Sequence, residues 1–413
     1  MKLHLGIILF FISSFAHAKT IEVCITCEVK TLKEGINLAE DGDTILIKKG
    51  IYKEHDVHII NKAIHIKGED NPVIDGENKG TVISIRGENF TIEGLTIINV
   101  GRSYTKDFAA ILVSESSNFT IKNNILENVF FGILLEKSTD GLIEGNKISS
   151  QAVSEANSGN GIHLWYSKKI TIHNNKVRQM RDGIYIEFGD NCIVTNNRAH
   201  ENVRYGLHFM FSNYNEYHYN VFEENGAGVA VMFSKFINMS NNTFRKSWGD
   251  ASYGLLLKEI NDSELNNNTF DQNTIGINAD GATRVTYIQN DFTNNGYAIK
   301  VHGACYNNTF KENNFLHNAF DVGYSGRMNY NVFDNNYWSS YSGYDLDKDG
   351  IGDVPYRPVR LFSHIVNKTP ESIVLLRSLF IDMVDFSERV SPIFTPAELI
   401  DENPRMRRIL WSK

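Results

Sequence analysis

Basic charge and long apolar stretches are what this sequence lacks. The formal net charge is −8 over 413 residues, which argues against a nucleic-acid-binding protein because such a protein needs a positive field. After the first eighteen residues no stretch of eighteen apolar residues follows, so the mature chain has no candidate transmembrane helix. Hydrophobic residues make up 42% and charged residues 22%, which excludes both a disordered chain and a membrane bundle.

Cysteine and proline are also scarce, with 4 and 7 copies. Residues 1–18 combine Lys2, a short apolar run and a small-x-small site at Ala16–Ala18, which predicts a signal peptide and export. In an oxidising compartment we expect Cys24 and Cys27 to form a local disulfide. A thiol metal site and a redox pair are the alternatives for this spacing.

Asparagine is abundant instead, with 46 copies, and one Asn recurs at steps close to 22 residues. A period of this length with short alternating apolar segments predicts an all-β fold, a right-handed parallel β-helix. The residue two positions after each repeating Asn is apolar and is expected to stack inside the coils. The repeating residues are Asn124, Asn146, Asn175, Asn197, Asn220, Asn242, Asn268, Asn290, Asn313 and Asn335. Asn tolerates left-handed turns and stacks by hydrogen bonds, so we assign these residues to a corner of each coil.

A second strand in each coil alternates inward and outward side chains. Its outward positions include His163, Trp165, Tyr185, Glu187, His208, Met210 and Met232. Imidazole with thioether sulfur is a ligand set for Cu(I), so His208, Met210 and Met232 are the candidate copper ligands. The alternative is a patch that a loop or a partner covers, with His163, Trp165, Tyr185 and Glu187 as the partner-binding residues.

Three insertions interrupt the period at the same corner, just before the second strand. They are Val100–Ala109, Ser149–Asn160 and Arg245–Tyr253. Insertions on one edge of a solenoid often mark its binding edge, and these would flank the outward residues.

The two ends of the chain depart from the repeat. Residues 31–40 predict a short helix that begins at Thr31 and covers the first coil. A second helix is expected from Pro370, with Leu376, Phe380 and Met383 on an apolar stripe. We therefore divide the chain into a signal peptide (1–18), an N-terminal cap (19–43), the β-helix (44–344), an acidic loop and cap (345–369) and a helical extension (370–413).

The acidic loop follows the D-x-D-x-D-G pattern of calcium loops, with Asp345, Asp347, Asp349 and Asp353 as candidate ligands. The twelfth position is Tyr356 instead of the usual Glu. A hydrogen-bonded turn without metal is therefore the alternative, and a bound Ca²⁺ would have a structural role.

No catalytic group stands out. Glu136, Glu187 and Lys258 share one outward column but do not lie on adjacent coils, whereas sugar-cleaving β-helices cluster such groups on one face. An exposed Trp165 could stack on a sugar ring. A secreted polysaccharide lyase or epimerase is therefore kept as the alternative function.

Residues 336–358, from Asn336-Tyr337-Trp338 through the acidic loop to Pro358, resemble the closing segment of the NosD family. The resemblance extends to residues 73–76, 101–103, 388–390 and 395–399, and so to nearly the whole mature chain. It implies a periplasmic, non-catalytic β-helix that helps to build the copper–sulfur centre of nitrous oxide reductase.

The resemblance also implies partners. These are the membrane subunit and ATPase of an ABC transporter, a small lipoprotein that hands over copper, and the reductase itself. Matched onto this chain, residues 370–413 would dock on the membrane subunit. A scaffold that gates the transporter without binding copper is a further interpretation.

Overall fold

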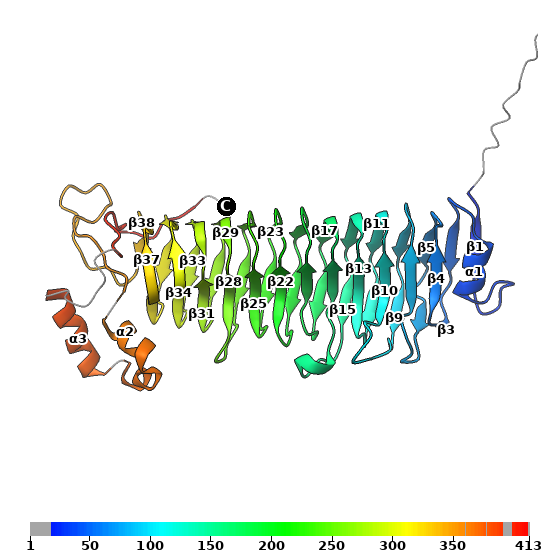
Figure 1. Cartoon of the computed structure of the whole chain (residues 1–413), viewed down its shortest axis with the longest axis horizontal. Coiled ribbons are helices and arrows are strands. Elements are labelled where there is room, and N and C mark those ends of the chain that lie inside the picture. Colours follow the sequence, from blue (N-terminus) through cyan, green and yellow to red (C-terminus); the bar gives the residue numbers. More distant parts are fainter. Residues whose placement is uncertain (1–17, 360, 377, 391–398, 412–413) are drawn as a thin grey trace, which may run out of the picture.

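The computed structural model describes residues 18–359, 361–376, 378–390 and 399–411. The expected signal peptide lies outside this part of the chain, apart from residue 18. The described residues form a long parallel β-solenoid with a helix at its first coil and further helices at its last coil (Figure 1). The predicted all-β solenoid is therefore confirmed.

Three parallel sheets run along the solenoid, and consecutive coils supply neighbouring strands. Sheet A has 14 strands: β1 (Thr20–Val23), β2 (Thr44–Ile47), β5 (His65–Gly68), β8 (Thr91–Glu93), β11 (Ser117–Lys122), β14 (Thr139–Glu144), β17 (Lys168–His173), β20 (Ile193–Thr195), β23 (Glu216–His218), β26 (Asn238–Ser240), β29 (Asn261–Asn266), β32 (Thr283–Ile288), β35 (Thr309–Lys311) and β38 (Val332–Asp334).

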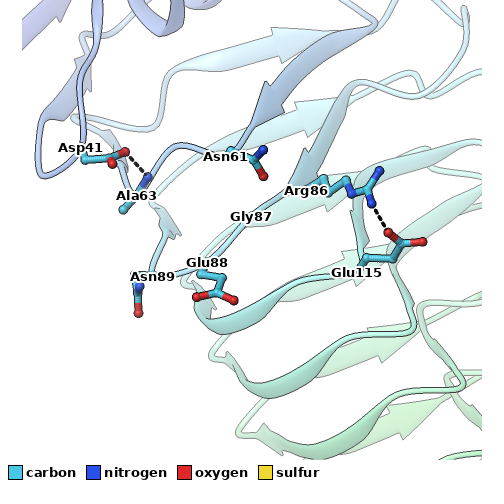
Figure 2. A pocket seen from close by; sticks show the side chains of 8 residues that line it. All are labelled: Asp41, Asn61, Ala63, Arg86, Gly87, Glu88, Asn89 and Glu115. Carbon is cyan, nitrogen blue, oxygen red and sulfur yellow. Dashed lines mark hydrogen bonds and ion pairs between the residues drawn. The ribbon is translucent and has the colours of Figure 1, made fainter.

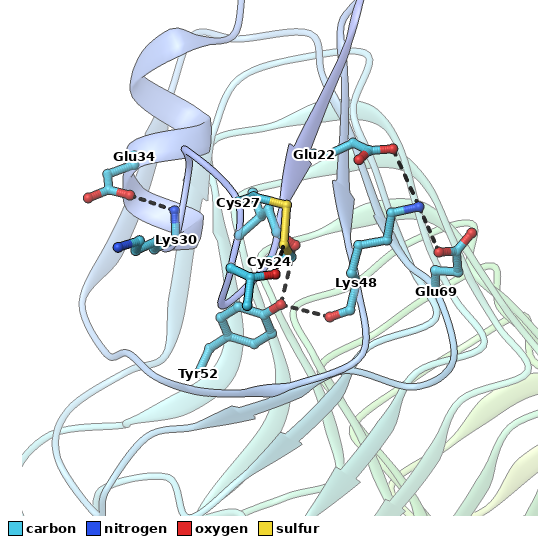
Figure 3. The surroundings of a disulfide bond; sticks show 10 residues. Glu22, Cys24, Cys27, Lys30, Glu34, Lys48, Tyr52 and Glu69 are labelled. Atoms are coloured by element: carbon cyan, nitrogen blue, oxygen red, sulfur yellow. Dashed lines mark hydrogen bonds and ion pairs between the residues drawn. A yellow bond between two sulfur atoms is a disulfide. The ribbon is translucent and has the colours of Figure 1, made fainter.

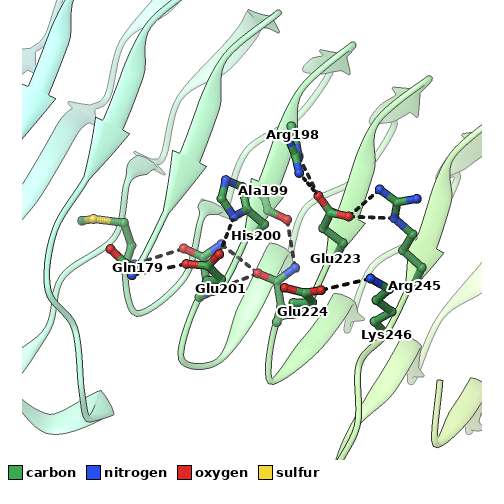
Figure 4. A network of polar contacts seen from close by, with 12 residues as sticks. Gln179, Arg198, Ala199, His200, Glu201, Glu223, Glu224, Arg245 and Lys246 are labelled. Carbon is green, nitrogen blue, oxygen red and sulfur yellow. Dashed lines mark hydrogen bonds and ion pairs between the residues drawn. The ribbon is translucent and has the colours of Figure 1, made fainter. Parts of the chain in front are cut away.

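Sheet B has 13 strands: β3 (Ile51–Lys53), β6 (Val73–Asp75), β9 (Thr96–Ile98), β12 (Ile125–Glu127), β15 (Lys147–Ser149), β18 (Lys176–Arg178), β21 (Arg198–His200), β24 (Val221–Glu223), β27 (Thr243–Arg245), β30 (Thr269–Asp271), β33 (Asp291–Thr293), β36 (Asn314–Leu316) and β39 (Tyr337–Trp338). On its outer face Glu223 joins two coils, because it accepts hydrogen bonds from Arg198 Nε (2.6 Å) and Arg245 Nε (2.7 Å) (Figure 4).

Sheet C has 12 strands: β4 (Val57–Ile60), β7 (Ile83–Arg86), β10 (Ala109–Ser114), β13 (Phe131–Glu136), β16 (Ile162–Trp165), β19 (Ile184–Glu187), β22 (Tyr205–Met210), β25 (Ala227–Met232), β28 (Tyr253–Lys258), β31 (Ile275–Asp280), β34 (Tyr297–Tyr306) and β37 (Phe320–Asn329). The three insertions all join a strand of sheet B to a strand of sheet C, at β9–β10, β15–β16 and β27–β28. They therefore lie at one corner, as predicted, and the second of them contains the 3₁₀ helix η1 (Glu155–Asn157).

The repeating Asn residues form a buried ladder inside the coils. The backbone N–H of Asn197 and its Nδ2 both donate to Oδ1 of Asn220, at 2.8 and 3.0 Å, and Nδ2 also donates to the carbonyl of Ile172. Each ladder Asn thus satisfies the backbone of a neighbouring coil. The left-handed corner belongs to the preceding residue, for example Asn196 (φ 57°), so the prediction that the ladder Asn itself turns the corner was wrong.

The last rung of this ladder is Asn336 and not Asn335. Asn313 donates to Asn336 Oδ1 through its backbone N–H and its Nδ2, whereas Asn335 (φ 56°) occupies the left-handed corner. One extra residue in this coil shifts the register. The inward residue that follows is therefore Trp338, which is 1% exposed, and not the expected Tyr337.

The N-terminal end is closed by α1 (Leu32–Leu38), and its Thr31 cap makes the reciprocal bonds of a capping box with Glu34. Just before this helix, Cys24 and Cys27 form a disulfide, so the favoured interpretation of this pair is confirmed (Figure 3). Tyr52 secures the same region by donating to the Lys48 carbonyl at 2.7 Å. Because β1 pairs in parallel with β2, the solenoid extends to Thr20, ahead of the expected start at residue 44.

The C-terminal end carries α2 (Leu361–Lys368), the 3₁₀ helix η2 (Pro370–Leu375) and α3 (Leu379–Val390). Phe362, Val366 and Ile381 pack over the outer face of the last strands of sheet C. A single helix from Pro370 was therefore the wrong prediction, since the backbone turns out of the helical conformation at Leu376 (ψ 130°). This break divides the expected stripe, so that Leu376 packs against the cluster around Phe362 while Phe380 and Met383 are 58% and 63% exposed.

The tail after residue 398 is not helical either, and it returns to the solenoid. Asp401 is fully buried and accepts hydrogen bonds from the backbone N–H and Nδ2 of Asn336, both at 3.0 Å, and from Trp338 Nε1 at 2.9 Å. Asp401 thus takes the place of the next Asn and ends the ladder. Further along, Trp411 Nε1 donates to the Gln289 carbonyl, so the tail runs back over earlier coils. None of the described helices is long and apolar enough to cross a bilayer.

Candidate functional site: an imidazole ladder on sheet C

Three of the predicted outward residues form a ladder on sheet C. His163, Tyr185 and His208 are register partners in β16, β19 and β22. Their rings stack with centroids 4.7 and 4.4 Å apart. They point outward as expected, and their exposed fractions are only 8%, 8% and 2%, which agrees with the alternative of a covered patch.

The second insertion reaches toward this ladder. Glu155 in η1 lies 3.9 Å from Arg204, and Asn160 at the end of the insertion is fully buried. Arg204 in turn contacts His208, so the insertion, Arg204 and the ladder form one layer. The site is therefore built from segments that lie far apart in the sequence.

A carboxylate and a guanidinium hold one side of His208. Asp182 is fully buried, and its two oxygens lie 3.3 Å from Arg204 Nε and 3.4 Å from His208 Nδ1. Arg204 Nη2 is 3.1 Å from the same Nδ1. Burial lowers the pKa of His208, with Asp182 opposing this effect, so the imidazole is held toward its neutral form.

The other imidazole nitrogens of the ladder lack partners. His208 Nε2 and both ring nitrogens of His163 are buried and have no hydrogen-bond partner among the described residues. Glu187 Oε2 lies 3.9 Å from His163 Nε2, and the neighbouring His163 holds the pKa of Glu187 below its ordinary value. Unpartnered buried polar atoms are uncommon in folded proteins, and although others occur in the described chain, such as Tyr217 Oη, three of them on two imidazoles of one ladder make this cluster a candidate site.

The candidate copper ligands are brought near one another only in part. Met210 and Met232 are register partners in β22 and β25, and both are half-buried. Met210 Sδ lies 3.6 Å from the hydroxyl of Tyr185. Trp165 is half-buried against the ring of Tyr166, at the open margin of the same patch.

Sequence reasoning missed Arg204 and gave Asp182 no role at the site. Both precede their strands, at the corner where the backbone leaves the regular alternation of sheet C. Asp182 reaches His208 from the preceding coil, and Arg204 reaches it from the corner before its own strand. The one available signal was charged residues beside an otherwise apolar repeat.

The acidic loop is a separate candidate metal site. Ligand oxygens of Asp345, Asp347 and Asp349 lie within 4.8 Å of one another, the one such group of His, Cys, Asp or Glu in the described chain. Asp353 is not in that group, and its Oδ2 instead accepts from the backbone of Leu346 at 2.7 Å. Calcium binding at this loop stays a prediction.

A polar surface hollow of about 490 Å³ lies near the N-terminal end (Figure 2). Its lining includes Asp41, Glu88 and an ion pair between Arg86 and Glu115. None of the predicted site residues lines it.

Comparisons with known proteins agree with the resemblance drawn from the closing segment. The family model described as NosD, periplasmic copper-binding protein, matches residues 144–343. A Pseudomonas aeruginosa protein named "Probable ABC transporter binding protein NosD" is 29% identical over 395 residues, which cover 91% of each chain. The chain is related to the NosD proteins. A Stutzerimonas stutzeri protein of the same name is 27% identical, and the aligned region covers 84% of each chain.

Solved structures support the fold alone. A family 28 exopolygalacturonase from Yersinia enterocolitica superposes with a TM-score of 0.62 at 12% identity, over 77% of this chain and 78% of the enzyme. At that identity the likeness to an enzyme carries no function. The relatives with NosD in their names are called binding proteins.

Proposed function

We propose that this chain is a non-catalytic periplasmic accessory protein that handles copper in the assembly of the copper–sulfur centre of nitrous oxide reductase. The relationship to the NosD proteins supports this proposal, since the family description is copper-binding and two relatives are named for an ABC transporter. Copper is then the cargo of the protein, which receives the ion and passes it on.

His208 carries the proposal at the level of residues. Its Nδ1 lies beside Asp182, and its Nε2 is buried without a partner among the described residues. A carboxylate behind one nitrogen orients an imidazole whose other nitrogen can bind a metal. Met210, on the same strand, and Met232, on the next coil, supply soft sulfur ligands that suit Cu(I).

Titration with Cu(I) against a chromophoric competitor tests this site. We expect Met210→Leu with Met232→Leu to weaken Cu(I) binding at least about tenfold, because both thioethers are lost while side-chain volume is kept. Met239→Leu is the matched control, since Met239 is buried inside the coils. Unchanged affinity in the double variant removes these two residues from the ligand set.

We further propose that α3 contacts the membrane subunit of the transporter. Phe380 and Met383 are 58% and 63% exposed on this short helix, beyond what its packing on the last coil uses. Exposed apolar side chains at the end of a rod suit a partner interface.

Co-purification with the transporter tests this contact. Phe380→Ser with Met383→Ser should abolish it, while Leu410→Ser, an exposed apolar position on the tail (84%), should not. Full recovery of the complex with the double variant would place the transporter elsewhere.

A further inference from the structure

Four consecutive coils carry an aromatic residue at the corner that follows sheet C. These residues, called the aromatic edge, are Tyr166, Phe188, Phe211 and Phe233. Their rings stack with centroids 4.5, 5.3 and 5.1 Å apart and nearly parallel planes. Tyr166, Phe211 and Phe233 are 48%, 41% and 39% exposed, so the edge is an open surface.

Chain stability does not account for the aromatic edge. Each of these residues adopts a left-handed conformation, with φ between 48° and 51°. That conformation costs a bulky residue about 1–2 kcal/mol, which offsets the roughly 0.5–1.5 kcal/mol that a stacked aromatic pair contributes. Neighbouring coils place Glu115, Lys137 and Glu259 at the same corner. A charged residue is thus sufficient for the turn.

The stacking restricts what the edge can bind. Ring faces that cover one another offer only their rims to solvent, so they cannot stack on a sugar ring. Two nearby lysines are engaged, since Lys168 pairs with Asp190 at 3.2 Å and Lys235 lies over the ring of Phe236. An anionic membrane surface needs an excess of basic residues, whereas this corner carries Glu115 and Glu259 as well as Lys137. These features favour the apolar surface of a protein.

The charges at the two ends of the edge favour a second copy. Lys137 precedes the edge by one coil and Glu259 follows it by one coil. Both are exposed, and neither has an ion-pair partner in the described part of the chain; Lys137 Nζ lies over the ring of Trp165, 5.6 Å from its centroid. If two edges meet in antiparallel fashion, each Lys137 faces the Glu259 of the other copy, Tyr166 faces Phe233, and Phe188 faces Phe211. A two-fold axis requires this self-complementarity.

We propose that the aromatic edge is the interface through which two copies of this chain pair, antiparallel about an axis between the Phe188 and Phe211 rungs. Tyr214 and Phe236, 54% and 41% exposed and stacked at 4.8 Å, extend the apolar surface beside it. The six rings offer roughly 500 Å² per copy, below the ~800 Å² of a standard interface, which predicts a reversible dimer.

Sedimentation velocity of the mature full chain, from about 1 to about 100 μM, measures the pairing. We expect a concentration-dependent dimer. Phe188→Asn with Phe211→Asn should weaken it at least about tenfold, because the central rungs are lost. Asn accepts the left-handed conformation, so these changes do not threaten the fold. Tyr219→Asn is the matched control, an exposed aromatic residue (59%, φ 57°) at another corner.

Charge reversal gives an independent test. Lys137→Glu should weaken the dimer by up to about tenfold, because like charges then meet at both ends. Adding Glu259→Lys should restore it. A wild-type chain that stays monomeric over the whole range overturns the proposal, as does a dimer that the paired Asn changes leave intact. The proposal is also overturned if the wild-type chain is monomeric and binds vesicles while the paired Asn variant does not. That result would assign the edge to a membrane.

Discussion

Two ladders of side chains run along this solenoid, one inside the coils and one on the outer face of sheet C. In the inner ladder each Asn from Asn124 to Asn313 donates its backbone N–H and its Nδ2 to the Asn of the next coil. In the outer ladder His163, Tyr185 and His208 stack just as regularly, but three ring nitrogens have no hydrogen-bond partner among the described residues. Burial is similar in the two, so burial alone does not separate a structural ladder from a functional one; hydrogen-bond satisfaction does.

Removing one inner rung should have the largest effect. In Asn220→Ala the backbone N–H and Nδ2 of Asn197 lose their shared acceptor, and the Val194 carbonyl loses its donor. At about 1–3 kcal/mol for each unsatisfied buried group, we expect a loss of at least about 3 kcal/mol in unfolding free energy. Urea denaturation with hydrogen exchange of the neighbouring coils measures it.

Asn157→Ala is the control for this change, because Asn157 is exposed in η1. A loss below about 1 kcal/mol for Asn220→Ala would show that water replaces the missing amide. The inner ladder would then be less distinct from the outer one.

Asp401 tests how the inner ladder ends. Asp401→Ala leaves two donors of Asn336 and one of Trp338 without an acceptor, so docking of the tail should weaken by about 1–3 kcal/mol. Asp401→Asn keeps an acceptor and should dock as well as the native residue or better, since it removes a buried charge. Hydrogen exchange at the Asn336 amide reports the docking.

The pH dependence follows from the same carboxyl group. Burial raises the pKa of Asp401 above its ordinary value, although its hydrogen bonds with Trp338 and Asn336 oppose the shift. The folded state therefore binds this proton more readily, and protection of the Asn336 amide should be greatest at acid pH and fall as pH rises through the raised pKa. In Asp401→Asn that contribution should vanish, and an unchanged pH profile would assign it to another group.

The acidic loop holds three clustered carboxylates that belong to neither ladder. If Asp345, Asp347 and Asp349 bind Ca²⁺, calcium at ten times its Kd should stabilise the loop by about 1.4 kcal/mol. Thermal unfolding with Ca²⁺ or a chelator measures this effect, with Asp347→Asn as the variant that should abolish it. An identical response in that variant would favour the hydrogen-bonded turn without metal.

The sequence was sufficient to find the inner ladder, because the ladder repeats at a period that the sequence itself shows. Phe222 is fully buried as expected, whereas Asn220, assigned to the corner, is fully buried beside it. It was not sufficient for the covering of His208, which depends on Arg204 from the preceding corner and Glu155 from an inserted loop. Nor did it reveal that Asp401 ends the ladder, since 65 residues separate it from Asn336. Contacts between segments without a shared period leave no periodic signal.

The smallest effect on stability is expected in the outer ladder, and it is the sharpest contrast with Asn220. His163→Phe keeps a ring between Phe131 and Tyr185 and removes two nitrogens that have no hydrogen-bond partner in the described structure. Replacing an unsatisfied polar group by an apolar one of similar shape is nearly neutral, so unfolding free energy should change by less than about 1 kcal/mol. His208→Phe also removes Nδ1 from beside Asp182 and Arg204, so it should cost more, and its Cu(I) affinity should fall at least about tenfold if Nε2 is a ligand. If His163→Phe is as unstable as Asn220→Ala and His208→Phe keeps native copper affinity, the outer ladder is structural, and the distinction drawn from hydrogen-bond satisfaction fails for this protein.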